Sequence, residues 1–124
     1  MVIESERLIL RSWEYEDIDD LIEGLNNINV SKWLGAVPYP YTKKDAEEFI
    51  AYAKQSDKDS KNMMLAIVLK ENSKVIGGTS IESINKKDGT AGGGIWLNEK
   101  YQKNGYGTEA FSIRIKYPFS ILRN

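Results

Sequence analysis

The chain has 124 residues and a formal net charge of −1, with 17 lysines and arginines set against 18 acidic residues. This length suits one small domain, which we expect to span residues 1–124. The basic residues are scattered among acids and form no stripe, so nucleic acid is not an expected partner.

The sequence contains neither cysteine nor histidine. The lack of cysteine excludes disulfides, thiolate nucleophiles and cysteine-ligated metals within these residues. The lack of histidine removes the commonest general base near neutral pH, the Ser-His-Asp triad and histidine-ligated zinc. We therefore expect no metal, and chemistry that depends on carboxylates, tyrosine, lysine, water or main-chain groups.

The first residues have no basic region followed by an apolar core, and no apolar run reaches membrane-spanning length. We expect no membrane partner and a cytoplasmic location.

The first part of the chain predicts a strand and then a helix. Residues 7–13 alternate in the manner of a partly buried strand. An amphipathic helix ending near residues 26–27 is predicted by apolar residues at i, i+3, i+4 and i+7, namely Ile18, Leu21, Ile22 and Leu25. Residues 30–34 are expected to add a turn.

A proline-containing segment separates this helix from a second one. Pro38 and Pro40 require residues 37–41 to be extended or turning. Thr42 is a predicted N-cap, with Asp45 three residues later as in a capping box. The helical spacing continues to about Gln55.

The second half predicts a sheet. After an exposed loop at 56–62, strands are expected at 63–69, 75–84 and 90–98, joined by turns. These strands form an antiparallel meander that the strand at 7–13 can extend. The expected fold class is α+β, with a mostly antiparallel central sheet flanked by helices.

A loop with two glycines follows the last of these strands and precedes a helix start. Its sequence is Gln102-Lys103-Asn104-Gly105-Tyr106-Gly107, followed by Thr108. Unpaired amides at a helix N-terminus bind anions, and glycine lets the main chain approach phosphate closely. The spacing fits neither the dinucleotide-binding fingerprint nor the Walker motif.

These residues resemble the Q/R-x-x-G-x-G/A element of the GNAT family of N-acetyltransferases. Other segments resemble the branch of that family which acetylates ribosomal-protein alanines, and they occur in the same order: residues 5–11, 76–78, 95–98 and 108–110. The resemblance implies the GNAT (acyl-CoA N-acyltransferase) fold and acetyl-coenzyme A as co-substrate.

The resemblance also implies which residues bind the coenzyme. The loop amides would bind its diphosphate, from Gln102, Lys103, Asn104, Gly105, Tyr106, Gly107 and Thr108. The main chain of Trp96, Leu97 and Asn98 would bind its pantetheine arm. The alternative is that the two glycines only shape a strand-to-helix turn.

The implied reaction transfers an acetyl group directly to a primary amine, such as a protein N-terminus or a small amine. A cysteine acyl-enzyme is impossible without cysteine. The family often carries a glutamate at the position of Gly92, and Glu82 on the preceding strand is the candidate that could recruit a water instead; its alternative is a solvated acid. Trp33, Tyr39 and Tyr41 are candidate substrate-binding residues, with packing as their alternative role.

The family fold continues past this region into further strands, so we expect the domain to be incomplete at its C-terminus. Residues 110–121 fit a strand period and a helical face, and the resemblance favours a helix from about Thr108 that ends by Tyr117, before Pro118. An open sheet edge would favour a homo-oligomer formed by strand exchange. The alternatives are an inactive coenzyme A-binding or interaction domain, and an α/β interaction domain with an incidental glycine turn.

Overall fold

The structure, a computed structural model, describes residues 2–35, 37–59, 63–85, 90–92 and 94–116. Within these residues six strands form one sheet in which every pairing is antiparallel. The strands are β1 (Val2–Glu4), β2 (Leu8–Ser12), β3 (Met63–Leu69), β4 (Lys74–Asn85), β5 (Thr90–Gly92) and β6 (Ile95–Leu97). The order is β1-β2-β3-β4, and both β5 and β6 pair with β4.

The predicted antiparallel meander is confirmed, with two differences. β1 was not predicted, because three residues are too few to show a period. The strand expected at 90–98 is divided into β5 and β6. The register with β4 is the same on both sides of the break, since Glu82 lies opposite Gly92 and Thr79 lies opposite Ile95.

The helices agree with the sequence periods, with small shifts at their ends. They are α1 (Ile18–Leu25), α2 (Ile28–Ser31), α3 (Lys43–Asp59) and α4 (Tyr106–Lys116), with short 3-10 helices η1 (Tyr15–Asp17) and η2 (Glu99–Tyr101). α3 continues four residues beyond the predicted Gln55, and α4 begins two residues before the predicted Thr108. The prediction that Pro118 ends this helix concerns residues outside those described.

The predicted cap of α3 is a complete capping box. The Asp45 amide donates to Thr42 Oγ1 at 3.1 Å, and the Thr42 amide donates to Asp45 Oδ2 at 2.9 Å. Each side chain therefore satisfies a main-chain donor that the helix itself leaves unpaired.

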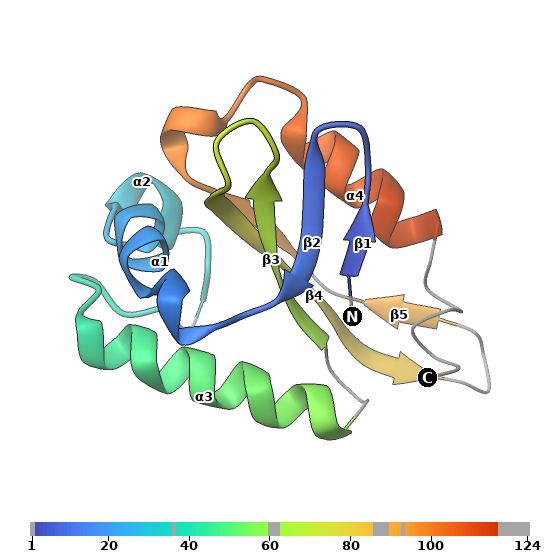
Figure 1. Cartoon of the computed structure of the whole chain (residues 1–124). Helices are drawn as coiled ribbons and strands as arrows, with labels where there is room; N and C mark the ends of the chain where they lie inside the picture. The colour runs from blue at the N-terminus through green and yellow to red at the C-terminus, as the bar shows by residue number, and fades with distance from the viewer. Residues whose placement is uncertain (1, 36, 60–62, 86–89, 93, 117–124) are drawn as a thin grey trace.

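The sheet lies between two groups of helices, and each face has its own core. β3 is buried on both faces: Leu65 and Ile67 join the core that includes Ala110 and Ile113 of α4. Ala66 and Val68 join the core shared with α1 and α3. Figure 1 shows α3 on one side of the sheet and α4 on the other. The continuous apolar run in this part of the sequence is explained by these two buried faces.

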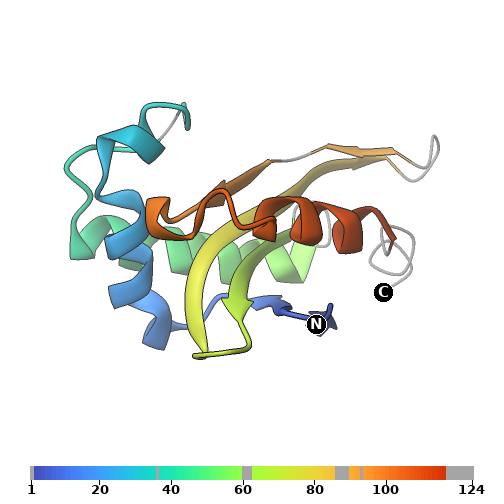
Figure 2. The ribbon, with the colours of Figure 1, turned by 90° about the horizontal axis from the view of Figure 1, so that it is seen from above.

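β4 carries the two remaining strands along its length. Figure 2 shows that β4 curves and that β5 runs beside its far half. β6 pairs with the near half, where Gly77 and Gly78 lie opposite Leu97 and Trp96. No helix in the described part of the chain has the length and apolar character needed to cross a bilayer.

Candidate functional site

The glycine loop between η2 and α4 has an irregular main chain that leads directly into the helix. Lys103 and Gly105 both adopt positive φ angles, of 67° and 81°. The Glu109 amide donates to the Gly105 carbonyl at 3.0 Å, which is the first hydrogen bond of the α4 ladder. The amides of residues 105–108 precede this bond and have no helical carbonyl to donate to. They lie at the positive end of the α4 dipole, where an anion is favoured.

The side chain of Glu109 attaches this loop to the turn between β1 and β2. Its carboxylate accepts hydrogen bonds from the Ser5 hydroxyl, from the Arg7 amide at 2.9 Å and from Arg7 Nε at 2.7 Å. Desolvation alone would raise the pKa of Glu109, but these donors outweigh it and lower that pKa below its ordinary value. Two of the segments that carried the resemblance, residues 5–11 and 108–110, are therefore joined in space.

Arg7 also contacts the loop itself. Its Nη1 donates to the Asn104 carbonyl at 3.1 Å, and its guanidinium carbon lies 4.4 Å from the centre of the Tyr106 ring. A Cβ at Gly105 would be 3.3 Å from Arg7 Nη2. The hydrogen bond with Glu109 is the main reason that the pKa of Arg7 is raised, so the loop has a permanent positive charge beside it. The residues predicted from the sequence to bind coenzyme A did not include Arg7.

The outer edge of β6 presents main-chain groups away from the sheet. The Asn98 amide donates to the Ile76 carbonyl at 2.7 Å, and the Ser80 amide donates to the Gly94 carbonyl at 3.0 Å. Hydrogen-bonded pairs alternate along an antiparallel ladder, so residues 94, 96 and 98 face β4 while Ile95 and Leu97 point their main-chain groups outward. Gln102 Nε2 donates to the outward carbonyl of Leu97 at 3.1 Å.

These hydrogen bonds reduce the number of predicted residues whose main chain could bind pantetheine. Trp96 is bonded into the ladder with Gly78, and the main-chain groups of Asn98 are occupied. The Asn98 side chain donates to Glu23 Oε2 at 2.7 Å and accepts from the Lys100 amide at 2.9 Å. Asn98 is thus a buried structural residue that connects β6, η2 and α1. Of the three predicted residues, Leu97 has an outward main-chain amide that could bind the pantetheine arm. Ile95, which was not predicted, also has outward main-chain groups.

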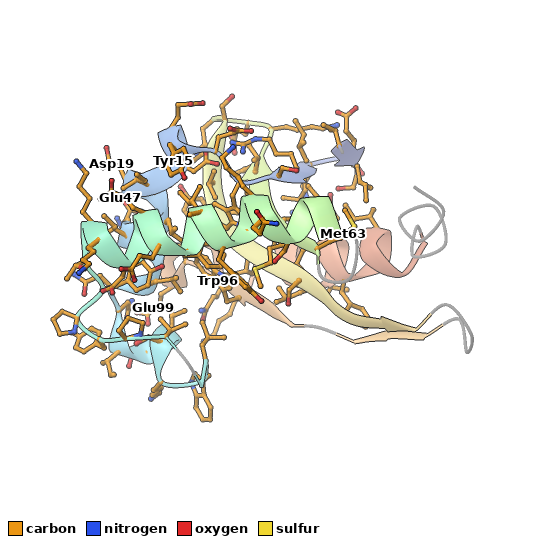
Figure 3. All side chains as sticks on the ribbon, turned by 90° about the horizontal axis from the view of Figure 1, so that it is seen from below. Tyr15, Asp19, Glu47, Met63, Trp96 and Glu99 are labelled. Atoms are coloured by element: carbon orange, nitrogen blue, oxygen red, sulfur yellow. The ribbon has the colours of Figure 1, made fainter. Side chains whose placement is uncertain are left out.

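The indole of Trp96 occupies a slot that two glycines create. A Cβ on Gly24 of α1 would be 2.6 Å from Trp96 Cζ3, and one on Gly78 of β4 would be 2.7 Å from Trp96 Nε1. The Trp13 ring lies 6.4 Å from that of Trp96, at an interplanar angle of 10°. Figure 3 shows Trp96 between α3 and the strand that carries it. Its side chain therefore forms part of a cavity wall, although the sequence predicted only a main-chain role.

A cavity of about 680 Å³ lies on this face of the sheet. Its floor includes Thr79 and Ser80 of β4, and its entrance includes residues that follow α2 and precede α3. The aromatic residues that line it are Trp13, Trp33, Tyr41, Phe49, Tyr52 and Trp96. Its volume is in the range typical of small-molecule sites.

A smaller groove of about 280 Å³ extends along the edge of β6. It is lined by Gln102 and Leu97 at one end and by Asn29 and Val30 of α2 on its other wall. Four residues line both this groove and the large cavity: Trp33, Leu34, Ile95 and Trp96. The glycine loop, the outward edge of β6 and the cavity thus follow one another along the surface. The wall formed by α2 could not be predicted from the sequence.

The three candidate substrate-binding residues have different positions. Trp33 is 78% exposed and lines both cavities, so its position is a cleft wall and not the core. Tyr41 is 5% exposed and lines the large cavity, and burial is the main cause that raises its pKa to about 12. It is therefore protonated near neutral pH and unsuited to accept a proton. Tyr39 is exposed and is not among the residues that line either cavity.

Glu82, the candidate for recruiting a water, lies on β4 directly opposite Gly92. Residues at opposite positions in an antiparallel pair have Cβ positions about 5 Å apart. The position of the missing glutamate and that of Glu82 are therefore neighbours. The Glu82 side chain lies outside the part of the chain that the structure describes in full.

Comparisons with known proteins identify the family of this chain. A model of the acetyltransferase (GNAT) domain family matches residues 7–123. An uncharacterized N-acetyltransferase, p20 of Bacillus licheniformis, is 28% identical over 118 residues, covering 95% of this chain and 66% of its own length. This chain therefore spans just under two thirds of that relative.

Two solved structures have the same fold. An acetyltransferase of the GNAT family from Bacillus anthracis superposes with a TM-score of 0.82 at 24% identity, covering 99% of this chain and 69% of its own. RimL, a ribosomal L7/L12 alpha-N-protein acetyltransferase in complex with coenzyme A, superposes with a TM-score of 0.76 at 19% identity, covering 94% of this chain and 67% of its own. The family model covers most of the chain, and the predicted fold class is confirmed, so this chain belongs to the GNAT acetyltransferase family.

Proposed function

We propose that this chain binds acetyl-coenzyme A and transfers its acetyl group to a primary amine. One observation carries the proposal: a glycine loop at a helix N-terminus, a strand edge with outward main-chain groups and a large cavity follow one another along one surface. Coenzyme A has the same order of parts, namely a diphosphate, an amide-containing arm and a reactive thioester.

The diphosphate would bind to the amides of residues 105–108. The start of the α4 ladder at Glu109 supports this placement. The Arg7 guanidinium beside the loop is paired with Glu109, so it adds N–H donors near the loop and no unpaired charge. The pantetheine arm would then lie in the smaller groove and pair with the outward groups of Ile95 and Leu97. Gln102 holds the Leu97 carbonyl, which leaves the amide of Leu97 and both main-chain groups of Ile95 for the coenzyme.

The thioester would enter the large cavity beside Ile95, where the groove and the cavity meet. The amine nitrogen, once it has lost a proton, attacks the thioester carbonyl carbon. The C–S bond then breaks, and the coenzyme thiolate leaves and takes up a proton. The outward amide of Ile95 would stabilise the oxygen charge of the tetrahedral intermediate, so the arm itself would pair with the Leu97 amide and the Ile95 carbonyl.

The amine needs a proton acceptor, because a free alkyl amine has a pKa of about 10.4. Tyr41 is excluded from this role because its pKa is about 12. We assign the role to Glu82, acting through a water, because its position lies opposite Gly92.

The experiment that tests the cofactor site compares ligands with and without the diphosphate. Isothermal titration should show that coenzyme A binds and that pantetheine, which lacks the diphosphate, binds far more weakly. Gly105→Asp should abolish coenzyme A binding, because it places a carboxylate and a strained side chain on the turn. Gly35→Asp is the matched control and should bind normally, since it adds the same carboxylate outside the loop, at a position where an added Cβ meets nothing within 4 Å. Equal binding of pantetheine and coenzyme A would refute the assignment of the loop.

A thiol-release assay with acetyl-coenzyme A and a panel of amines tests the transfer reaction. Turnover that Glu82→Gln reduces by about 100-fold is expected if this residue recruits the accepting water. If coenzyme A binds but no amine causes thiol release, the alternative prediction of an inactive coenzyme A-binding domain is the correct one.

We further propose that the outward edge of β6 supports self-association. Among the described strands β6 pairs only with β4, and an open edge is a template for another strand. Light scattering should detect a dimer that coenzyme A dissociates, because the pantetheine arm and a second strand would compete for Ile95 and Leu97. A monomer at all concentrations would contradict this proposal.

A further inference from the structure

The large cavity carries charge of one sign only. Asp45 and Glu48 are the acidic residues that line it, and no lysine or arginine is among its described lining residues. The cavity is partly open and mainly apolar, and its apolar walls strengthen the effect of fixed charges on an entering ligand. The cavity therefore favours a cation and disfavours a ligand that carries a carboxylate or a phosphate.

Two acidic residues and then two aromatic residues lie along one face of α3. Asp45, Glu48, Phe49 and Tyr52 line the cavity at i, i+3, i+4 and i+7. Glu47 falls outside this spacing and is not a lining residue. In Figure 3, Glu47 lies toward Asp19 and Tyr15 and away from Trp96.

Two aromatic side chains remain exposed where the cavity opens. Trp33 is 78% exposed and Tyr52 is 52% exposed, although both line the cavity. Lys32 Nζ already lies 5.4 Å from the centre of the Trp33 ring, so Trp33 offers apolar surface to a ligand. The carboxylates and the Tyr52 ring would attract the ligand's cationic group.

The polar groups of the floor are already used within the protein. Thr79 Oγ1 donates to the Gly94 carbonyl at 2.9 Å, and the same carbonyl accepts from the Ser80 amide. A peptide lying in this cavity would find few partners for its main-chain groups, and an unsatisfied buried amide is unfavourable. A protein N-terminus is therefore a poor fit.

We infer that the acceptor is a small cationic amine carried on an apolar or aromatic body. This inference rests on the proposed function, and it narrows the amine class that the same site acetylates. The ammonium group would enter past Glu48, with the body against Trp33 and Tyr52.

The test uses ligands that differ in one group. Tryptamine and tryptophan share the ring and the amine, and only tryptophan carries a carboxylate. In the presence of coenzyme A, isothermal titration should show tryptamine binding at least about tenfold more tightly than tryptophan or a serine-initiated tetrapeptide. Thiol release from acetyl-coenzyme A should follow the same ranking.

Substitutions of single residues test which side chains bind tryptamine. Glu48→Gln should weaken tryptamine binding by about 3- to 10-fold, and Trp33→Ala should weaken it similarly. Glu47→Gln should leave it unchanged, and both glutamate variants should bind coenzyme A normally. Equal binding of tryptophan or the peptide, or equal effects of the two glutamate substitutions, would overturn the inference. Absence of coenzyme A binding would instead refute the proposed function, and the tryptamine titration without coenzyme A would still test the cavity.

Discussion

In Gly24→Ala, a favourable change in helix propensity is opposed by an unfavourable contact at the wall of the cavity. Gly24 lies inside α1, where alanine is normally favoured over glycine by about 1 kcal/mol. A Cβ at this position would be 2.6 Å from Trp96 Cζ3 and 3.1 Å from Cη2, well inside the ordinary contact distance of about 3.5–4 Å.

The clash between the added Cβ and Trp96 should outweigh the gain in helix propensity, so the variant should be less stable than the parent. Overpacking a buried contact of this kind costs about 1–3 kcal/mol. The indole has little freedom to move, because Gly78 and Trp13 lie against it. We therefore expect a net loss of about 1 kcal/mol in the free energy of unfolding. For a chain of this length, that loss corresponds to a decrease of about 4 °C in Tm.

Urea unfolding of four proteins measures this balance: the parent, Gly24→Ala, Trp96→Phe and the double variant. Phenylalanine lacks the outer indole atoms that approach Gly24, so alanine at position 24 should be stabilising in the Trp96→Phe background. The coupling between the two sites should be about 1–2 kcal/mol. Gly35→Ala is a control, since its added Cβ meets nothing within 4 Å. If Gly24→Ala alone stabilises the protein by about 1 kcal/mol, the reasoning about the slot is wrong.

Two further predictions concern the loop before α4. Gly105→Ala should destabilise the protein by about 1–2 kcal/mol, because a side chain is unfavourable at its φ of 81°, whereas Gly107→Ala should change the urea midpoint little. Glu109→Gln should lower the free energy of unfolding at pH 7 by about 1–2 kcal/mol through weaker bonds to Ser5 and Arg7. The pKa of Glu109 is lowered in the folded state, so its stabilisation is complete above the unfolded value of about 4.3 and is lost as pH falls through the folded value. Urea midpoints of the parent and Glu109→Gln should therefore converge toward pH 3; a constant difference would contradict the assignment.

Much of the fold could be predicted because its signals are local. The i, i+3, i+4, i+7 pattern of residues 18–25 and the capping residues Thr42 and Asp45 each act within one or two helical turns. The glycine loop was also identifiable, since its anion-binding property follows from a strand, a positive φ and a helix start that are adjacent in the chain. β1 and the division of the strand at 90–98 were missed because segments of three residues show no usable period.

The sequence by itself determined most of the order of elements, the buried strand at residues 63–69 and the place of the glycine loop before α4. Only the tertiary structure decided that Asn98 is fully used in internal hydrogen bonds, that Trp96 fits against Gly24, and that Glu109 binds residues 5 and 7. The physical reason is separation along the chain. A periodic pattern shows which face of an element is buried, but which distant group it meets depends on strand register and helix packing. Those arise only when the whole sheet and both of its cores form together.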